Sequence, residues 1–120
     1  MSVTMWTLRP CVCLFLIFEL TKAAVPAELS AREAINKFDR GDGDLIIYVS
    51  GLTNAYGWVN AQSENAKLKM LFCPPENLAI TVSQNMDILK RFVAAHPRYA
   101  DSSLGLALLD ALKDALPCPD

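Results

Sequence analysis

The chain has 120 residues, of which 52% are hydrophobic, and its formal net charge is −2 at pH 7. This length is enough to bury the core of one domain and too short for two. The slightly acidic balance argues against nucleic acid as a partner, because phosphate backbones attract strongly basic surfaces.

The N-terminus has the pattern of a secretory signal peptide. Arg9 precedes an apolar run over residues 11–18, and the small residues Ala23 and Ala24 follow a polar pair. We therefore predict a signal peptide over 1–23 and a domain over 24–120 that has no stable membrane insertion after cleavage. A retained membrane anchor is the alternative, although the apolar run is shorter than the ~20 residues that a spanning helix needs.

Cleavage there would leave two of the four cysteines, Cys73 and Cys118. Two cysteines allow one disulfide, and closing a loop of about 45 residues stabilises a fold by roughly 4 kcal/mol on the chain-entropy model. Two unpaired buried thiols are the alternative to this disulfide. For the N-terminus, a lipid-anchored cysteine at position 11 or 13 is a further alternative, although neither follows the usual small-residue box. Two cysteines and one distant histidine form no metal-ligand cluster, so we predict no metal and no cofactor.

The first predicted helix begins at a capping box. Ser30 and Glu33 have the S-x-x-E spacing in which each side chain satisfies the other's free backbone amide. Residues 39–44 are glycine and aspartate except for Arg40, which predicts a turn. Asp44 is the expected cap of the next helix.

Residues 45–62 form the second predicted helix. The segment 46–49 has strand propensity, but the apolar residues recur at helical spacings of four and three. The expected inner face is Leu45, Val49, Leu52, Tyr56 and Val59. Gly51 and Gly57 each cost a helix about 1 kcal/mol relative to alanine, so they predict close approach of a neighbouring backbone, with a frayed helix as the alternative.

Residues 63–70 are polar and predict an exposed loop that turns inward at Cys73. A second capping box, Thr81 with Gln84, opens the third helix, which His96-Pro97 ends. Its expected inner face is Val82, Met86, Leu89, Phe92 and Val93.

The last predicted helix follows a connector over residues 98–103 and stops at Pro117. Its expected inner face is Leu104, Leu108, Ala111, Leu112, Ala115 and Leu116. Four helices with short links predict an all-α fold, a small four-helix domain with one core and one disulfide.

Nothing in the sequence indicates an enzyme. His96 is the only histidine, and no serine stands in a G-x-S-x-G setting that could build a hydrolytic triad with it. At a helix end its imidazole interacts favourably with the helix dipole, so we assign it a structural role.

Several motifs together resemble the Rap/Tai immunity family. They are Phe72-Cys73-Pro74-Pro75, the helix start from Thr81 to Gln84, His96-Pro97 and Leu116-Pro117-Cys118. A weaker similarity extends upstream, where residues 48–52 with Trp58 look like the family's aromatic-x-x-glycine helix. Many relatives carry a second cysteine pair in the earlier helices, which residues 24–72 do not supply.

The resemblance implies a function by binding. Members of this family are small exported helical proteins that protect a bacterium against peptidoglycan amidases delivered by type VI secretion. By this resemblance the chain binds and occludes a cognate amidase effector in the periplasm, and a homodimer is possible. Two alternatives remain: a periplasmic stress chaperone of the HdeA type, and an orphan relative with another envelope partner.

The resemblance aligns no toxin-contacting residues, so we predict them from exposure and residue type. The polar loop 63–69 and the turn 40–44 are expected to lie in solvent near Trp58, which could anchor a binding hot spot. The predicted contact residues are Arg40, Asp42, Trp58, Glu64, Lys67 and Lys69. For Trp58 a half-buried place in the core is the alternative.

Overall fold

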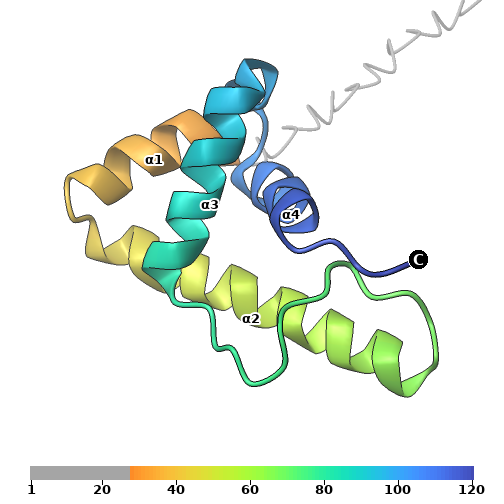
Figure 1. Cartoon of the computed structure of the whole chain (residues 1–120). Coiled ribbons are helices and arrows are strands. Elements are labelled where there is room, and N and C mark those ends of the chain that lie inside the picture. Colours follow the sequence, from red (N-terminus) through yellow and green to blue (C-terminus); the bar gives the residue numbers. More distant parts are fainter. Residues whose placement is uncertain (1–27) are drawn as a thin grey trace, which may run out of the picture.

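A computed structural model describes residues 28–120 of the chain (Figure 1). Its helices are α1 (Ala31–Asp39), α2 (Gly43–Asn65), α3 (Val82–Ala95), the short 3-10 helix η1 (Pro97–Asp101) and α4 (Leu104–Ala115). The described residues contain no strand, so the predicted all-α fold with four α-helices is confirmed. The predicted signal peptide over 1–23 and its cleavage site lie outside this range. Within it, no helix is both long and apolar enough to cross a membrane.

The N-termini of α1 and α4 lie side by side. The N–H of Ala31 donates to the carbonyl of Ser102 at 2.9 Å, and the N–H of Leu104 donates to the carbonyl of Leu29 at 2.7 Å. Ser30 caps α1 by accepting a hydrogen bond from the N–H of Glu33, which is one half of the predicted capping box; among the described residues the Glu33 side chain makes no return bond to Ser30. Local sequence therefore sets the start of α1, and backbone pairing joins it to α4.

The cap of α2 is Asp42, and the prediction of Asp44 is wrong. Asp42 Oδ1 accepts the N–H of Leu45 at 3.0 Å, and Lys37 Nζ lies 3.2 Å from Asp42 Oδ2. The hydrogen bond from Leu45, followed by that from Lys37, holds the pKa of Asp42 below its ordinary value. The turn is tight because Gly41 adopts a φ of +74°, a left-handed conformation that glycine accepts without strain.

Residues 45–62 are helical as predicted, and α2 continues to Asn65. Leu45 and Val49 are buried, whereas Val59 is exposed and Asn60 takes the expected inner position. The reason is the helical period, since 3.6 residues per turn carries the inner face from position 56 to position 60. Residues 63–65, predicted as loop, form the last turn of this helix.

Gly51 and Gly57 do not mark a close approach, and that prediction is wrong. Both are exposed, and no atom outside the local backbone lies within 4 Å of where a Cβ would stand. The crowded glycine is Gly105 of α4, where a Cβ would lie 3.5 Å from the Tyr56 hydroxyl. That hydroxyl donates to the carbonyl of Gly105 and joins α2 to α4.

The core lies where α3 and α4 pack against each other, against α1 and against the N-terminal half of α2. Thr81 and Gln84 form both halves of the predicted capping box at the start of α3. The predicted inner faces of α3 and α4 are confirmed except at Ala115, which is exposed, while Ala107 is buried in addition. The largest fully buried side chains are Val49, Met86, Leu89, Leu104, Leu108 and Leu112.

His96 caps the end of α3, where its ring packs against that of Phe92 with centroids 4.6 Å apart and the ring planes tilted by 50°. Tyr99 of η1 completes this aromatic group by packing edge-on against Phe92. His96 thus packs against its neighbours at the end of α3, the position predicted from the sequence.

Candidate partner-binding surface

The long loop between α2 and α3, residues 66–81, returns alongside the C-terminal half of α2 (Figure 1). A loop of this length with no helix or strand of its own is uncommon in a compact domain and is often functional. Its apolar part, residues 70–72, lies against the body of the protein, and Phe72 is buried.

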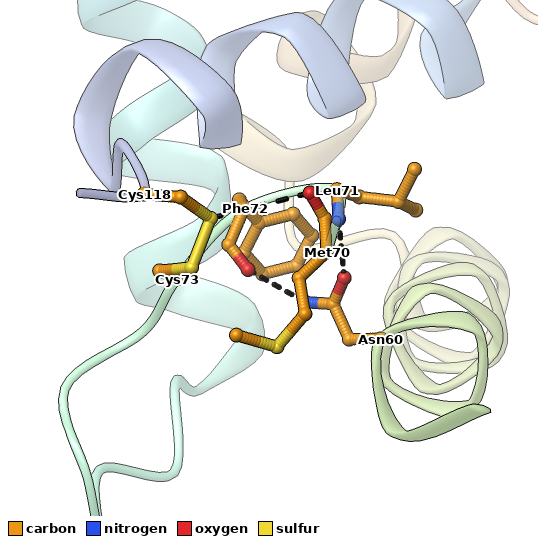
Figure 2. The surroundings of a disulfide bond; sticks show 6 residues. All are labelled: Asn60, Met70, Leu71, Phe72, Cys73 and Cys118. Atoms are coloured by element: carbon orange, nitrogen blue, oxygen red, sulfur yellow. Dashed lines mark hydrogen bonds between the residues drawn. A yellow bond between two sulfur atoms is a disulfide. The ribbon is translucent and has the colours of Figure 1, made fainter. Parts of the chain in front are cut away.

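Asn60 fixes the middle of this loop. Its amide Nδ2 donates to the carbonyl of Phe72 at 2.8 Å, and its Oδ1 accepts the N–H of Leu71 at 2.7 Å. Figure 2 shows the amide aimed from α2 at the loop backbone. One buried side chain therefore satisfies a donor and an acceptor that would otherwise be stranded.

The disulfide fixes the same loop from the other side. Cys73 and Cys118 are bonded, which confirms the predicted pair, with their Cα atoms 4.8 Å apart. The N–H of Cys73 also donates to the carbonyl of Leu116 at 2.9 Å. Cys118 Sγ lies 4.0 Å from the Met70 carbonyl (Figure 2), a packing contact only, because an oxidised sulfur has no proton to donate.

An open groove of about 1270 Å³ separates the C-terminal half of α2 from the outer part of the loop. Its α2 wall includes Thr53, Gly57, Asn60 and Glu64, and the disulfide lies in its wall as well. The loop contributes both apolar and charged side chains. Those that matter most here are Lys67, Leu68, Lys69, Glu76, Leu78 and Ile80.

Three of the predicted contact residues come together in this groove: Glu64, Lys67 and Lys69. All three are exposed, and Lys67 has a φ of +56°, which turns the chain sharply after α2. Charges of both signs along a groove can be complementary to charges on a partner, which contributes specificity more than affinity.

The structure does not bring Arg40 and Asp42 to the same place. They lie in the turn before α2, and the 23 residues of that helix, about 35 Å at 1.5 Å per residue, separate them from Lys67 and Lys69 at the far end of the groove. Asp42 is also occupied by its cap and its ion pair with Lys37. The predicted contact surface is therefore divided between two ends of one helix.

Trp58 lies on the outside of α2, with 73% of its surface exposed, so it does not belong to the core. It stands close to the groove in sequence but is not among the residues that line it. Its neighbours on the exposed side of α2 include Ile47, Tyr48 and Val59, which are also exposed.

The chemistry of the groove favours binding. Among residues 28–120, no group of three or more histidine, cysteine, aspartate or glutamate side chains is placed to hold a metal ion. The groove contains carboxylates, ammonium groups and amides at its rim and apolar side chains within the loop. Such a set can hold a partner segment by hydrogen bonds, ion pairs and apolar contact.

Sequence reasoning missed Asn60. The available signal was a polar residue at an inner position of an otherwise apolar helix, one turn after Tyr56. A buried amide must find hydrogen-bond partners, so such a position indicates contact with unpaired backbone.

Residues 20–118 match the family model of the Rap1a immunity proteins. The match includes all four α-helices and both cysteines of the disulfide. It confirms the likeness indicated by the cysteine, capping and helix-ending motifs. Searches of the curated proteins and of the solved structures return no match to this chain.

Proposed function

Because the chain belongs to the Rap1a immunity protein family, we propose that it is exported to the periplasm and there binds and occludes a peptidoglycan amidase delivered by type VI secretion. The observation that carries this proposal is the family match over residues 20–118. The role is one of binding, in which the protein excludes substrate from the amidase and performs no reaction itself.

We propose the groove beside α2 as the contact surface for the amidase. A loop binds its partner more tightly when it is already ordered in the free protein, because less conformational entropy is then lost on binding. The Asn60 hydrogen bonds and the disulfide meet that cost for residues 71–73. The outer residues of the loop then present Lys67 and Lys69 on a fixed base.

Charge reversal at the groove tests this assignment. The double variant Lys67→Glu/Lys69→Glu changes two exposed side chains and leaves the core unaltered. We expect Lys67 and Lys69 to meet acidic groups of the amidase, so the reversal should weaken binding to a peptidoglycan amidase encoded beside this chain's gene by roughly 30-fold or more, since like charges at an interface cost several kcal/mol. Calorimetric titration of that amidase measures the change.

Arg40→Glu is the matched control, because it reverses an exposed charge at the far end of α2. It should bind like the unaltered protein. If Arg40→Glu weakens binding and the lysine variant does not, the contact surface is the turn before α2. If the unaltered protein shows no binding, the amidase proposal itself fails.

A further inference from the structure

The Cys73–Cys118 disulfide joins two parts of the groove wall that lie outside the helices. On one side it holds the outer loop, residues 74–80, all of which line the groove. On the other side it holds residues 117–120, of which Pro119 lines the groove as well. Figure 2 shows the bond between the start of this outer loop and the segment that follows α4.

Hydrogen bonds hold the outer loop weakly. Among the described residues, the only backbone hydrogen bond that residues 74–80 make runs from the N–H of Leu78 to the carbonyl of Pro75, within the loop itself. Most of the segment is exposed. Its fixed ends are therefore the disulfide at Cys73 and the cap of α3 at Thr81.

The helical body does not depend on the disulfide in the same way. The largest fully buried side chains belong to α2, α3 and α4. Asn60 holds the backbone of residues 71 and 72 by its two hydrogen bonds, and the N–H of Cys73 donates to the carbonyl of Leu116. Breaking the S–S bond therefore loosens the groove wall on both sides and leaves the core contacts in place.

The disulfide is within reach of a reductant that enters the groove. Both cysteines are half-buried, and both line the groove. A thiolate of a small dithiol attacks one of the two sulfur atoms and forms a mixed disulfide, which the second thiol of the reagent resolves. The dithiol becomes a disulfide, and its two electrons and two protons pass to the thiols of Cys73 and Cys118.

We propose that the Cys73–Cys118 disulfide is a redox switch for the groove. When the bond is formed, the wall is fixed and the groove binds its partner. When a dithiol reduces the bond, residues 74–80 and 117–120 become mobile, and the affinity falls because binding must then order them. The proposal rests on the proposed function in one respect, that the groove is the contact surface for the amidase.

The coupling acts in both directions. A partner in the groove covers the half-buried sulfur atoms and excludes the reductant. By thermodynamic linkage, the factor by which reduction weakens binding equals the factor by which binding stabilises the disulfide against reduction. A tenfold loss of affinity corresponds to a reduction potential lowered by about 30 mV in the complex, since this couple transfers two electrons.

The switch ties binding to the compartment. Thiols stay reduced in the cytosol, whereas disulfides form and persist in oxidising compartments outside it. A chain that has not yet been exported therefore has a loosened groove, and its full affinity develops after oxidation.

Calorimetric titration tests the effect on affinity, with the full chain expressed with its own N-terminal segment and purified with its disulfide oxidised. Cys73→Ser/Cys118→Ser keeps the groove in its reduced form. It should bind a peptidoglycan amidase encoded beside this chain's gene about 10-fold more weakly, because binding must order the wall. Equal affinity of the oxidised chain and this variant would overturn the proposal.

The same variant controls for the reductant. Dithiothreitol should weaken binding of the unaltered chain to the level of Cys73→Ser/Cys118→Ser and should leave the variant itself unchanged. A loss of binding in both proteins would place the effect of the reductant on the amidase, and the comparison without reductant then decides.

The rate of reduction tests the shielding on the unaltered chain, so it does not depend on the folding of a cysteine variant. Dithiothreitol is added to the free chain and to the chain saturated with amidase, and the thiols are trapped by alkylation and counted by mass spectrometry. Bound amidase should slow the reduction by about 10-fold or more, because the attacking thiolate must reach a sulfur atom. Lys67→Glu/Lys69→Glu at the same concentrations should gain little protection. An unchanged rate in the saturated complex would contradict the switch.

Backbone NMR relaxation tests the loosened wall without any partner. On reduction the order parameters of residues 76–80 should fall below about 0.6, while those of α4 stay near about 0.85. Unchanged values in the loop, or unfolding of α4, would exclude a switch that is local to the groove. If the loop loosens but the oxidised chain does not bind the amidase, the proposed function fails and the redox response of the groove stands.

Discussion

At the scale of single residues, Asn60 connects the helical body to the loop beside the groove. Its side chain pairs with the backbone of Leu71 and Phe72 much as a neighbouring strand would. The backbone of residues 71 and 72 belongs to no helix that could satisfy its hydrogen-bonding groups. The Asn60 amide therefore replaces water as their partner when the loop is buried.

Asn60→Ala should lower the free energy of unfolding by about 2 to 4 kcal/mol, because it leaves one buried donor and one buried acceptor unpaired. Urea denaturation measures the loss. Asn54→Ala makes the same chemical change at an exposed position of α2 and should stay within about 0.5 kcal/mol of the unaltered protein. Equal effects of the two substitutions would show that Asn60 does not hold the loop.

Tyr56 gives the protein a dependence on alkaline pH. Partial burial raises the pKa of Tyr56 to about 12, with smaller contributions from Tyr48 and Glu28. The folded state thus holds this proton more tightly than the unfolded state, whose tyrosine titrates near its ordinary value of 10.0. The resulting stabilisation is complete below pH 10 and is lost as the pH rises toward 12.

Tyr56→Phe should therefore flatten the fall in stability above pH 10 while it costs about 1 kcal/mol at neutral pH through the lost bond to Gly105. Urea denaturation at a series of pH values from neutral to alkaline gives both quantities. Identical alkaline slopes for the variant and the unaltered protein would exclude Tyr56 as the source.

At the scale of elements, local sequence predicts the starts of α1 and α3 and the proline-marked ends of α3 and α4, but neither the start nor the end of α2. Ser30, Thr81 and their partners three residues later place two starts correctly, because a capping side chain reaches only its own first turn. The end of α2 was missed by three residues, since residues 63–65 are polar whether they are helical or not. Asp42 and Asp44 are both good caps, and the fold selects the earlier one.

Substitution by alanine should change the free energy of unfolding in opposite directions at Gly57, within α2, and at Gly41, before it. Gly57→Ala should raise the free energy of unfolding by about 0.5 to 1 kcal/mol, because the site is helical and open. Gly41→Ala should lower it, because a φ of +74° strains any side chain. Thermal denaturation of both variants tests this; a destabilising Gly57→Ala would mean that another group approaches α2 there.

The disulfide should contribute roughly 4 kcal/mol, since it closes a loop with a sequence separation of 45 residues. Cys73→Ser/Cys118→Ser is the direct test by urea denaturation. The same loss should follow reduction of the unaltered protein with dithiothreitol. A loss well below about 2 kcal/mol would mean that Asn60 and the Leu116 carbonyl already hold the loop without the covalent bond.

At the scale of the whole molecule, the sequence was sufficient for the fold class and for the disulfide, because helical periodicity and cysteine number are properties of the chain alone. It was insufficient for the contact surface. Arg40 and Asp42 are as polar as Lys67 and Lys69, and the sequence predicts both pairs in exposed segments. In the structure a helix of 23 residues separates the two pairs. Only the packing of α2 against α3 and α4 shows which of them face the groove.

Trp58 shows what the helical period can predict. Aromatic residues usually belong to the core, but the apolar spacing of α2 includes Tyr56 and leaves out Trp58. In the structure Tyr56 packs against α4, whereas Trp58 faces outward. The spacing therefore predicts which aromatic residue lies outside the core, but not which partner it contacts.

We propose that this Rap1a family member neutralises a peptidoglycan amidase by binding it. The test is the rate at which a peptidoglycan amidase encoded beside this chain's gene hydrolyses purified peptidoglycan, with the oxidised protein added in increasing amounts. Hydrolysis should stop near one equivalent of this chain and return when Lys67→Glu/Lys69→Glu replaces it. Undiminished hydrolysis at a large molar excess of the unaltered protein would rule the proposal out.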